Sequence, residues 1–89
     1  METSQERVSK VLVTGISGLI GSHMAEYLLG KGYNVSGVDN LSGGYIENVP
    51  KGVKFYLADL TDAEKLSCIF KEIKPDYVYH FAAYAAEGL

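Results

Sequence analysis

The sequence predicts an α/β fold in which helices cover both faces of a parallel β-sheet. Short apolar runs, typical of strands that are buried on both faces, alternate with segments whose apolar residues recur at helical spacing. Three glycines, Gly15, Gly18 and Gly21, extend from the end of the first apolar run into the first turn of the first helical segment. This order of strand, glycine-rich turn and helix is typical of a doubly wound sheet.

The first two elements follow from the apolar pattern. Residues 8–14 are predicted as a strand because their centre, residues 11–13, is wholly apolar. Residues 19–31 are predicted as an amphipathic helix, and Gly32 is placed to end it in a left-handed conformation. The apolar residues that define the expected buried face are Ile20, Met24 and Leu28, with Ala25 and Leu29 beside them.

The next two strands are shorter and less regular. Residues 34–39 are predicted as a second strand, which Gly37 weakens. Residues 41–52 have no clean period and are predicted as an irregular connection with room for one helical turn. Residues 53–58 carry apolar side chains at alternate positions, which indicates a third strand near the sheet edge.

The last predicted elements are a helix and a fourth strand. Thr61 and Glu64 have the spacing of a capping box at the start of this helix, and Pro75 ends it. Residues 77–82 are predicted as the fourth strand. The apolar residues at helical spacing between these limits are Leu66, Ile69, Phe70 and Ile73.

Right-handed crossovers arrange these strands in the order 3-2-1-4, which is the first half of a doubly wound sheet. Residues 1–89 are then one N-terminal segment of such a fold, and the sheet is incomplete. The fourth strand is an open edge with exposed aromatic side chains. We therefore expect that the chain can self-associate through this edge.

Composition excludes several function classes. The 89 residues, with 47% apolar and 21% charged, form one globular domain at most. The net charge is −3 and the basic residues are scattered, so a nucleic-acid or anionic-membrane surface is not expected. Residues 1–10 contain no apolar stretch long enough for a signal or membrane segment. Cys68 is the single cysteine, which argues against a metal site and favours a reducing, cytoplasmic location.

The glycine-rich turn predicts a site for a pyrophosphate. The first N–H groups of a helix lack partners within the helix, and together with the helix dipole they attract phosphates. We expect Gly15 to allow the tight turn, Gly18 to let phosphate approach, and Gly21 to let the helix pack on the strand. The other expected phosphate contacts are the Ser17 hydroxyl and the main chains of Leu19 and Ile20.

Asp39 extends this prediction to a dinucleotide. It ends the second strand, where a carboxylate accepts hydrogen bonds from the hydroxyls of an adenosine ribose. The same charge repels a 2′-phosphate, so the pattern favours NAD over NADP. A nucleoside triphosphatase loop requires a lysine after its last glycine, where this chain has Ser22.

Four motifs in order resemble the extended short-chain dehydrogenase/reductase family, chiefly its NAD-dependent nucleotide-sugar epimerases and dehydratases. The first is the spacing Gly-x-x-Gly-x-x-Gly at residues 15–21. The others are Val38-Asp39-Asn40-Leu41-Ser42, Ala58-Asp59-Leu60 and His80-Phe81-Ala82-Ala83. The resemblance covers residues 10–88, implies a Rossmann-like fold, and is to the N-terminal part of UDP-glucose 4-epimerase-like proteins.

The resemblance also implies roles for individual residues, and a catalytic pair and a sugar-nucleotide domain that this sequence does not contain. It implies ribose contacts from Asp39, Asn40 and Ser42, adenine contacts from Asp59 and Leu60, and a backbone lining from Phe81, Ala82 and Ala83. Members carry a catalytic Tyr-x-x-x-Lys pair and a sugar-nucleotide domain further along the chain. We therefore assign no catalytic residue here and expect the chain alone to be inactive. Tyr27 and Lys31 match the letters of the pair, but they lie on the first helix, where we expect packing and capping roles.

Some of these residues have simpler interpretations. On a buried strand, His80 is expected to be a hydrogen-bonded core residue, and Cys68 a small packing residue. Asp59 either recognises adenine or caps the turn before Thr61. Asn40 and Ser42 are either cofactor contacts or turn residues.

Three functional hypotheses remain open at this stage. The first is the NAD-binding segment of a nucleotide-sugar epimerase or dehydratase, with the sugar nucleotide bound only by a longer parent protein. The second is a stand-alone module that binds an adenine dinucleotide. The third is a truncated subunit whose sheet edge pairs with a partner or with itself. The residues do not identify the sugar, and they do not separate epimerase, dehydratase and decarboxylase.

Overall fold

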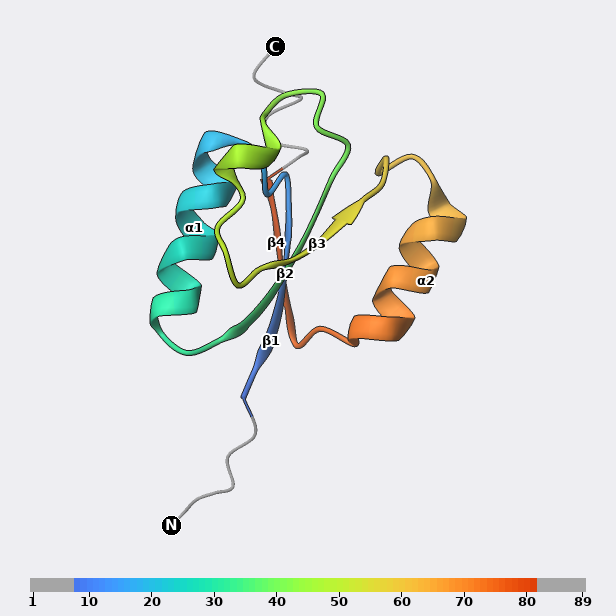
Figure 1. Ribbon diagram of the computed structural model, residues 1–89. Coiled ribbons are helices and arrows are strands. Elements are labelled where there is room, and N and C mark those ends of the chain that lie inside the picture. Colours follow the sequence, from blue (N-terminus) through green and yellow to red (C-terminus); the bar gives the residue numbers. More distant parts are fainter. Residues whose placement is uncertain (1–7, 82–89) are drawn as a thin grey trace.

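The computed structural model describes residues 8–81 and shows a four-stranded parallel sheet with helices on both faces (Figure 1). The strands are β1 (Lys10–Thr14), β2 (Asn34–Asp39), β3 (Lys54–Leu57) and β4 (Tyr77–His80). The other elements are α1 (Leu19–Gly30), α2 (Ala63–Ile73) and one 3-10 turn, η1 (Ile46–Asn48). The strand order β3-β2-β1-β4 confirms the predicted first half of a doubly wound sheet.

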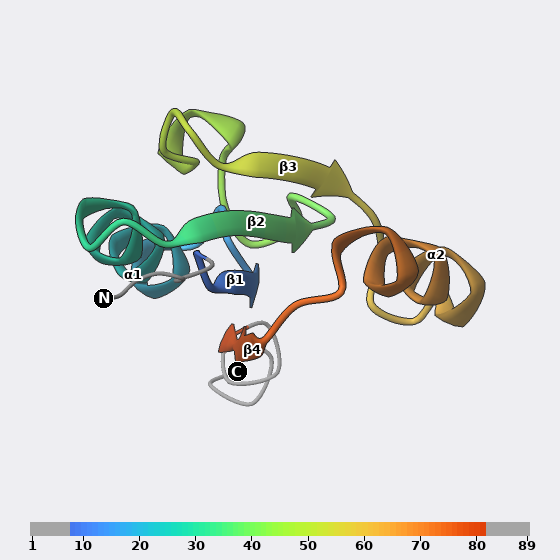
Figure 2. The ribbon, with the colours of Figure 1, turned by 90° about the horizontal axis from the view of Figure 1, so that it is seen from below.

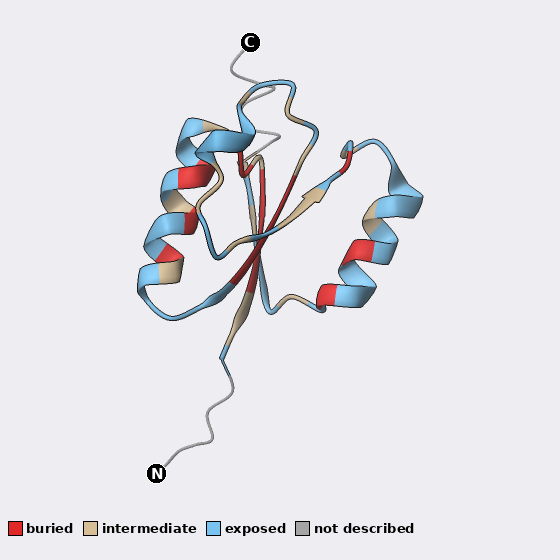
Figure 3. Ribbon diagram, viewed as in Figure 1, coloured by how far each residue is buried: buried red, intermediate tan, exposed pale blue. Residues whose placement is uncertain are grey.

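The elements form three layers, with α1 on one side of the sheet and α2 on the other (Figure 2). Buried residues lie along the central strands and on the inner sides of the helices (Figure 3). The core cluster on the α1 side contains Val11, Val13, Ile16, Ala25, Leu28 and Val35. The cluster on the α2 side contains Leu12, Val38, Ala58, Ile69 and Ile73. Successive residues of β1 thus point into opposite layers, as the wholly apolar run predicts.

The buried face of α1 differs from the predicted one. Its buried residues include Gly21, Ala25 and Leu28, whereas Ile20 is 51% exposed. The small residues Gly21 and Ala25 let the helix lie close to the sheet, so the contacting stripe is rotated away from Ile20. The prediction that Ile20 belongs to the core face was wrong.

The end of α1 follows the prediction closely. Gly32 has a φ of 91°, in the left-handed region, and its N–H donates to the carbonyl of Leu29 at 3.0 Å. The N–H of Tyr33 reaches back to the carbonyl of Leu28 at 3.1 Å. These paired bonds are a Schellman motif, which satisfies carbonyls that a helix end leaves open.

Gly37 has a packing role that the sequence did not reveal. It lies on β2 opposite Val13 of β1, on the side of the sheet that faces α1. A Cβ at this position would lie 2.6 Å from Cγ1 of Ile16, which is fully buried. The absence of a side chain at Gly37 therefore makes room for Ile16.

The start of α2 lies one residue later than its predicted cap. Asp62 is the N-cap, and its carboxylate accepts a hydrogen bond from the N–H of Lys65 at 3.1 Å. Thr61 does not cap the helix because its N–H and hydroxyl both donate to Asp59. The helix ends before Pro75, as predicted, with Lys74 in a left-handed conformation at a φ of 50°. A residue before proline disfavours the right-handed helical region, which accounts for this ending.

The side of the sheet beyond β1 is formed by β4. Its Tyr77 and Val78 are 55% and 45% exposed, in agreement with the predicted open edge. His80 is also exposed, so the prediction that it lies in the core was wrong, although its predicted hydrogen bond is present. Cys68 is exposed, so the prediction that it is a packing residue was wrong. Within residues 8–81, no helix has the length and apolar character needed to cross a membrane.

Candidate functional site

The glycine-rich turn joins the end of β1 to the start of α1. Gly15 has a φ of 74°, which a residue with a side chain rarely adopts. A Cβ at Gly21 would collide with the carbonyl group of Gly15. The expected role of Gly15, to allow the turn, is therefore confirmed. Gly21 allows the helix to pack closely, but the backbone that it contacts is that of the turn and not that of the strand.

The first turn of α1 has none of the usual groups that satisfy a helix start. Its N-cap is Gly18, which has no side chain to accept a hydrogen bond, and the first turn contains no acidic residue. The side chains of Leu19 and Ile20 are exposed and apolar. The first amides of the helix therefore form a positive end suited to an external anion.

Asp39 lies directly beside this turn. Its Oδ2 accepts hydrogen bonds from the N–H of Ser17 at 3.0 Å and from the Ser17 hydroxyl at 2.7 Å. Its Oδ1 accepts the N–H of Leu41 at 2.9 Å. The Ser17 hydroxyl is thus bonded to the carboxylate in this structure, and its contact with a phosphate stays a prediction.

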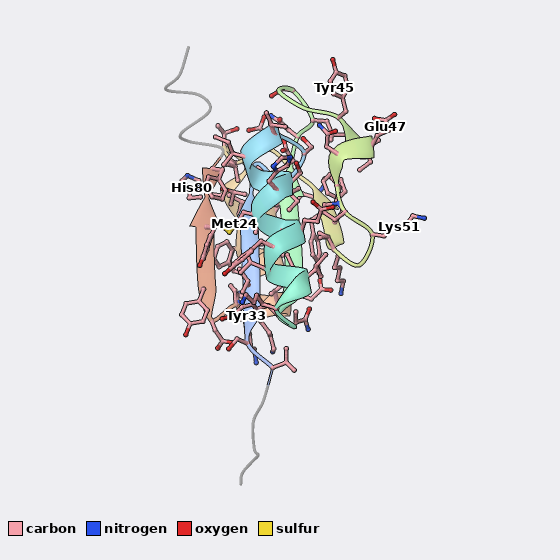
Figure 4. The ribbon with its side chains drawn as sticks, turned by 90° about the vertical axis from the view of Figure 1, so that its left-hand side faces the viewer. Met24, Tyr33, Tyr45, Glu47, Lys51 and His80 are labelled. Atoms are coloured by element: carbon pink, nitrogen blue, oxygen red, sulfur yellow. The ribbon has the colours of Figure 1, made fainter. Side chains whose placement is uncertain are left out.

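The connection after β2 returns to the same place. Leu41 has a φ of 65°, an uncommon conformation for a residue with a side chain. The Asn40 side chain accepts the N–H of Ser42 at 3.0 Å, so both residues form a turn here. Their cofactor contacts stay a prediction. Figure 4 shows Tyr45, just before η1, and His80, at the end of β4, both toward the end where α1 begins.

Asp59 and Leu60 follow β3 at the same edge of the sheet. Asp59 Oδ1 accepts the N–H of Thr61 at 2.9 Å and its hydroxyl at 2.8 Å. These bonds, the backbone one first, and a smaller contribution from the Asn40 side chain lower the pKa of Asp59. The carboxylate is therefore ionised and shapes the turn, while adenine recognition stays a prediction.

The end of β4 completes the edge. His80 Nδ1 and Thr14 Oγ1 are 2.7 Å apart and hydrogen-bonded, which ties β4 to β1. Phe81 is half-buried beside the core on the α1 side. Ala82 and Ala83 lie outside the described residues. All four strands are parallel, so the residues after them lie at one edge of the sheet, its carboxyl edge, which is where such folds have their ligand crevice.

Other candidate groups lie elsewhere. Tyr27 and Lys31 are at the far end of α1, where the Lys31 ammonium lies 5.5 Å from the centre of the Tyr27 ring. This is a surface cation–π contact away from the crevice. In the described part of the chain, no three histidine, cysteine, aspartate or glutamate side chains are grouped to hold a metal ion.

A sequence model of the NAD dependent epimerase/dehydratase family matches residues 11–88. The chain belongs to this family. UDP-glucose 4-epimerase of Drosophila melanogaster is 44% identical over 91 residues, which cover 88% of this chain and 26% of the fly protein. Probable UDP-arabinose 4-epimerase 3 of Arabidopsis thaliana is 46% identical over 94 residues, covering 96% of this chain and 23% of the plant protein.

Solved structures agree with this membership. The UDP-glucose 4-epimerase of Thermus thermophilus, crystallised as a complex with NAD, is 51% identical and superposes with a TM-score of 0.77. The match covers 80% of this chain and 23% of that one. The predicted family resemblance is therefore confirmed, and the chain spans about a quarter of the length of the curated relatives it matches.

The sequence did not indicate three contributors to the site. The N–H of Tyr45 and the side-chain amide of Asn48 both donate to the carbonyl of Ser17, at 3.3 Å and 2.9 Å. Gly44 passes so close to Ser17 that a Cβ there would collide with its main chain. The irregular pattern of residues 41–52 carried no signal for these contacts.

Proposed function

We propose that this chain forms the adenosine and pyrophosphate part of an NAD site in a nucleotide-sugar epimerase or dehydratase. One observation carries the proposal: the uncapped start of α1 and the carboxylate of Asp39 lie together, joined through Ser17. A dinucleotide has a diphosphate that the start of α1 can bind and ribose hydroxyls that can donate to the carboxylate of Asp39.

The residues of the crevice fit this ligand. The first turn of α1 presents N–H groups to the diphosphate without a capping side chain, and Asp39 accepts the N–H of Leu41 in the connection where a ribose would lie. Bound NAD supplies a hydride acceptor to the parent enzyme. The residues proposed to contact it are Gly15, Ser17, Gly18, Leu19, Ile20, Gly21, Asp39, Asn40, Ser42, Asp59, Leu60, Phe81, Ala82 and Ala83.

A titration tests the binding function directly. The purified chain is expected to bind ADP-ribose and NAD with millimolar or tighter affinity, and NADP more weakly, by isothermal titration calorimetry. Asp39→Lys should weaken ADP-ribose binding about tenfold or more, because it removes an acceptor with a full charge. Glu26→Lys is the matched control, since it makes the same charge change on an exposed part of α1. Equal effects of the two substitutions would contradict the assignment of Asp39.

The reaction of the parent protein is the second part of the proposal. We propose transient oxidation of a sugar hydroxyl by NAD, followed by reduction or elimination. We also propose that the 89-residue chain alone is inactive, because its Tyr27–Lys31 pair lies away from the crevice. No conversion of UDP-glucose or UDP-arabinose is expected in a chromatographic assay. Turnover above the buffer background would refute this part and leave the binding assignment in place.

Self-association through β4 is a separate proposal, favoured by the exposure of Tyr77 and Val78 on a strand whose described partner is β1 alone. Light scattering coupled to size exclusion should detect dimers at high concentration. Val78→Lys should shift the chain toward the monomer, because a charge on an edge strand opposes pairing. A strictly monomeric wild-type chain would contradict it.

We also propose a cytoplasmic location. Cys68 is exposed and unpaired. An accessible thiol of this kind persists in a reducing compartment and is oxidised in an oxidising one. Cell fractionation that found the protein with secreted markers would refute this location.

A further inference from the structure

Ser17 is the point at which three segments of the chain meet. It lies in the glycine-rich turn, and its side chain is completely buried. Its N–H and hydroxyl donate to Asp39 at the end of β2, and its carbonyl accepts hydrogen bonds from Tyr45 and Asn48 in the connection before β3. Each hydrogen-bonding group of this residue is therefore used to join other parts of the proposed site.

The approach of the connection to Ser17 is unusually close. A Cβ at Gly44 would collide with the carbonyl carbon and oxygen of Ser17. A Cβ at the preceding residue, Gly43, would meet nothing within 4 Å. The backbone at Gly44 is therefore held against Ser17, while its neighbour is in open space.

These bonds restrict the carboxylate of Asp39. Among the described residues, Oδ2 accepts two hydrogen bonds and Oδ1 accepts one. An ionised carboxylate has about four acceptor positions, so about one remains, on Oδ1. The Ser17 hydroxyl at 2.7 Å has the short distance of a bond to a charged acceptor, which fixes the rotation of the carboxylate.

We propose that Ser17 is a positioning residue that holds the Asp39 carboxylate and the β2–β3 connection in place for the adenosine ribose before the ligand binds. The identity of the ligand rests on the proposed NAD function. Ser17 then acts on the ribose through Asp39, and its own hydroxyl does not need to touch the ligand. Through Ser17, the glycine-rich turn that would face the phosphates and the Asp39 carboxylate that would face the ribose are held together.

Amide hydrogen exchange tests the structural part without any ligand. Ser17→Ala is expected to speed exchange at the N–H groups of Leu41 and Tyr45 about threefold or more, because both bonds depend on the fixed positions of Asp39 and Ser17. Ser22→Ala is the matched control. It removes another buried hydroxyl, which among the described residues donates to the carbonyl of Leu19 within α1. Unchanged exchange at both amides in Ser17→Ala would overturn the proposal.

Binding measurements test the functional part. Ser17→Ala should weaken ADP binding about three- to tenfold, the range of one lost hydrogen bond. It should change the affinity for 2′,3′-dideoxyadenosine 5′-diphosphate less than about twofold, because this ligand lacks the hydroxyls that Asp39 reads. A general structural defect, or a direct contact of the Ser17 hydroxyl with the diphosphate, would weaken both ligands equally, and this outcome would overturn the proposal. No ADP binding by the wild-type chain would instead refute the proposed function itself, and the ribose role of Ser17 with it.

The two adjacent glycines provide an independent check. Gly44→Ala must move the connection away from Ser17, so exchange at Tyr45 should accelerate and ADP binding should weaken. Gly43→Ala should leave both within about twofold of the wild type, because its Cβ points into open space. Equal behaviour of the two variants would overturn the role given to the connection.

Discussion

The two helices of this chain begin in opposite ways. α2 begins at Asp62, whose carboxylate accepts the N–H of Lys65, and Glu64 adds a negative charge in its first turn. α1 begins after Gly18, with no capping side chain and no acid in its first turn. Both helices follow a strand of the same sheet. The first amides of α2, a helix with a structural role, are thus capped by the chain itself. The first amides of α1 are left without a cap, and we assign them to a ligand.

The two helices also approach the sheet differently. α2 reaches it through the long side chains of Ile69 and Ile73. α1 brings its backbone against the turn at Gly21, where even a methyl group has no room. The close approach holds the first amides of α1 at the crevice, whereas α2 is set further back by its side chains.

The largest expected effect comes from closing the space beneath α1. Gly21→Ala places a methyl group against the backbone of Gly15, so α1 must shift; we expect a loss of about 1–3 kcal/mol in unfolding free energy. The ADP-ribose affinity should fall about tenfold or more, since the amides move with the helix. Gly30→Ala, on the same helix with open space around it, should stabilise the chain by up to about 1 kcal/mol. Urea denaturation and calorimetry measure both, and similar losses in the two variants would contradict the close-packing argument.

The second prediction makes α1 begin as α2 does. Gly18→Asp introduces a capping carboxylate, and the extended backbone of Gly18 (φ −80°, ψ 170°) accepts it. We expect stability to stay equal or rise by a few tenths of a kcal/mol, while the ADP-ribose affinity falls about tenfold or more because the new charge repels phosphate. Unchanged binding would show that the start of α1 is not the anion site.

The third prediction makes α2 begin as α1 does. Asp62→Ala removes the cap of α2 and should cost about 1 kcal/mol of unfolding free energy. ADP-ribose binding should stay within about twofold of the wild type, because the Asp62 carboxylate bonds to Lys65 within α2 and is not among the proposed contacts. A large loss of binding in a variant that remains folded would contradict the division of roles between the helices.

The smallest expected effect concerns the ion pair between α2 and β3. Lys54 Nζ lies 3.0 Å from Glu72 Oε2, and this bond, followed by that of the Tyr56 hydroxyl, lowers the pKa of Glu72 below its ordinary 4.5. The pKa of Glu72 is lower in the folded chain than in the unfolded chain. The stabilisation from the ion pair is therefore present above pH 4.5 and is lost as the pH falls through the folded pKa. Both side chains are more than half exposed, so the stabilisation is small.

We expect Glu72→Gln to lower the urea midpoint slightly at neutral pH, and the difference from the wild type to close in acid, below the folded pKa of Glu72. Added salt should reduce the difference at neutral pH, because exposed charges are screened. A difference that is the same at both pH values would show that the ion pair does not stabilise the fold.

Most of the fold was predictable because its signals are local. The glycine spacing specifies both the turn and the packing of α1, since Gly15 and Gly21 act on residues a few positions away. The cap of α2 was missed by one residue because Thr61 and Asp62 are both good caps. Only the structure shows that the N–H and the hydroxyl of Thr61 donate to Asp59. The buried face of α1 was misjudged at Ile20 because apolar residues surround much of that helix.

The internal bonds of the site were not predictable from the sequence. Ser17 and Asp39 are 22 residues apart, and they meet because β1 and β2 are parallel neighbours that end at the same edge. The sequence placed Asp39 at the correct strand end but did not show what holds its carboxylate. Gly44 and Asn48 lie in a segment without periodicity, so their contacts with Ser17 depend wholly on the path of the connection.

The fit of Ile16 against Gly37 has a further consequence for how β1 and β2 align. If β2 slipped by one residue along β1, a serine or a valine would replace the glycine beneath Ile16, and the side chains of β2 would change faces. The fully buried Ile16 has no space to accept either. This pair therefore opposes a slip between the two central strands and so helps to keep Asp39 beside the turn.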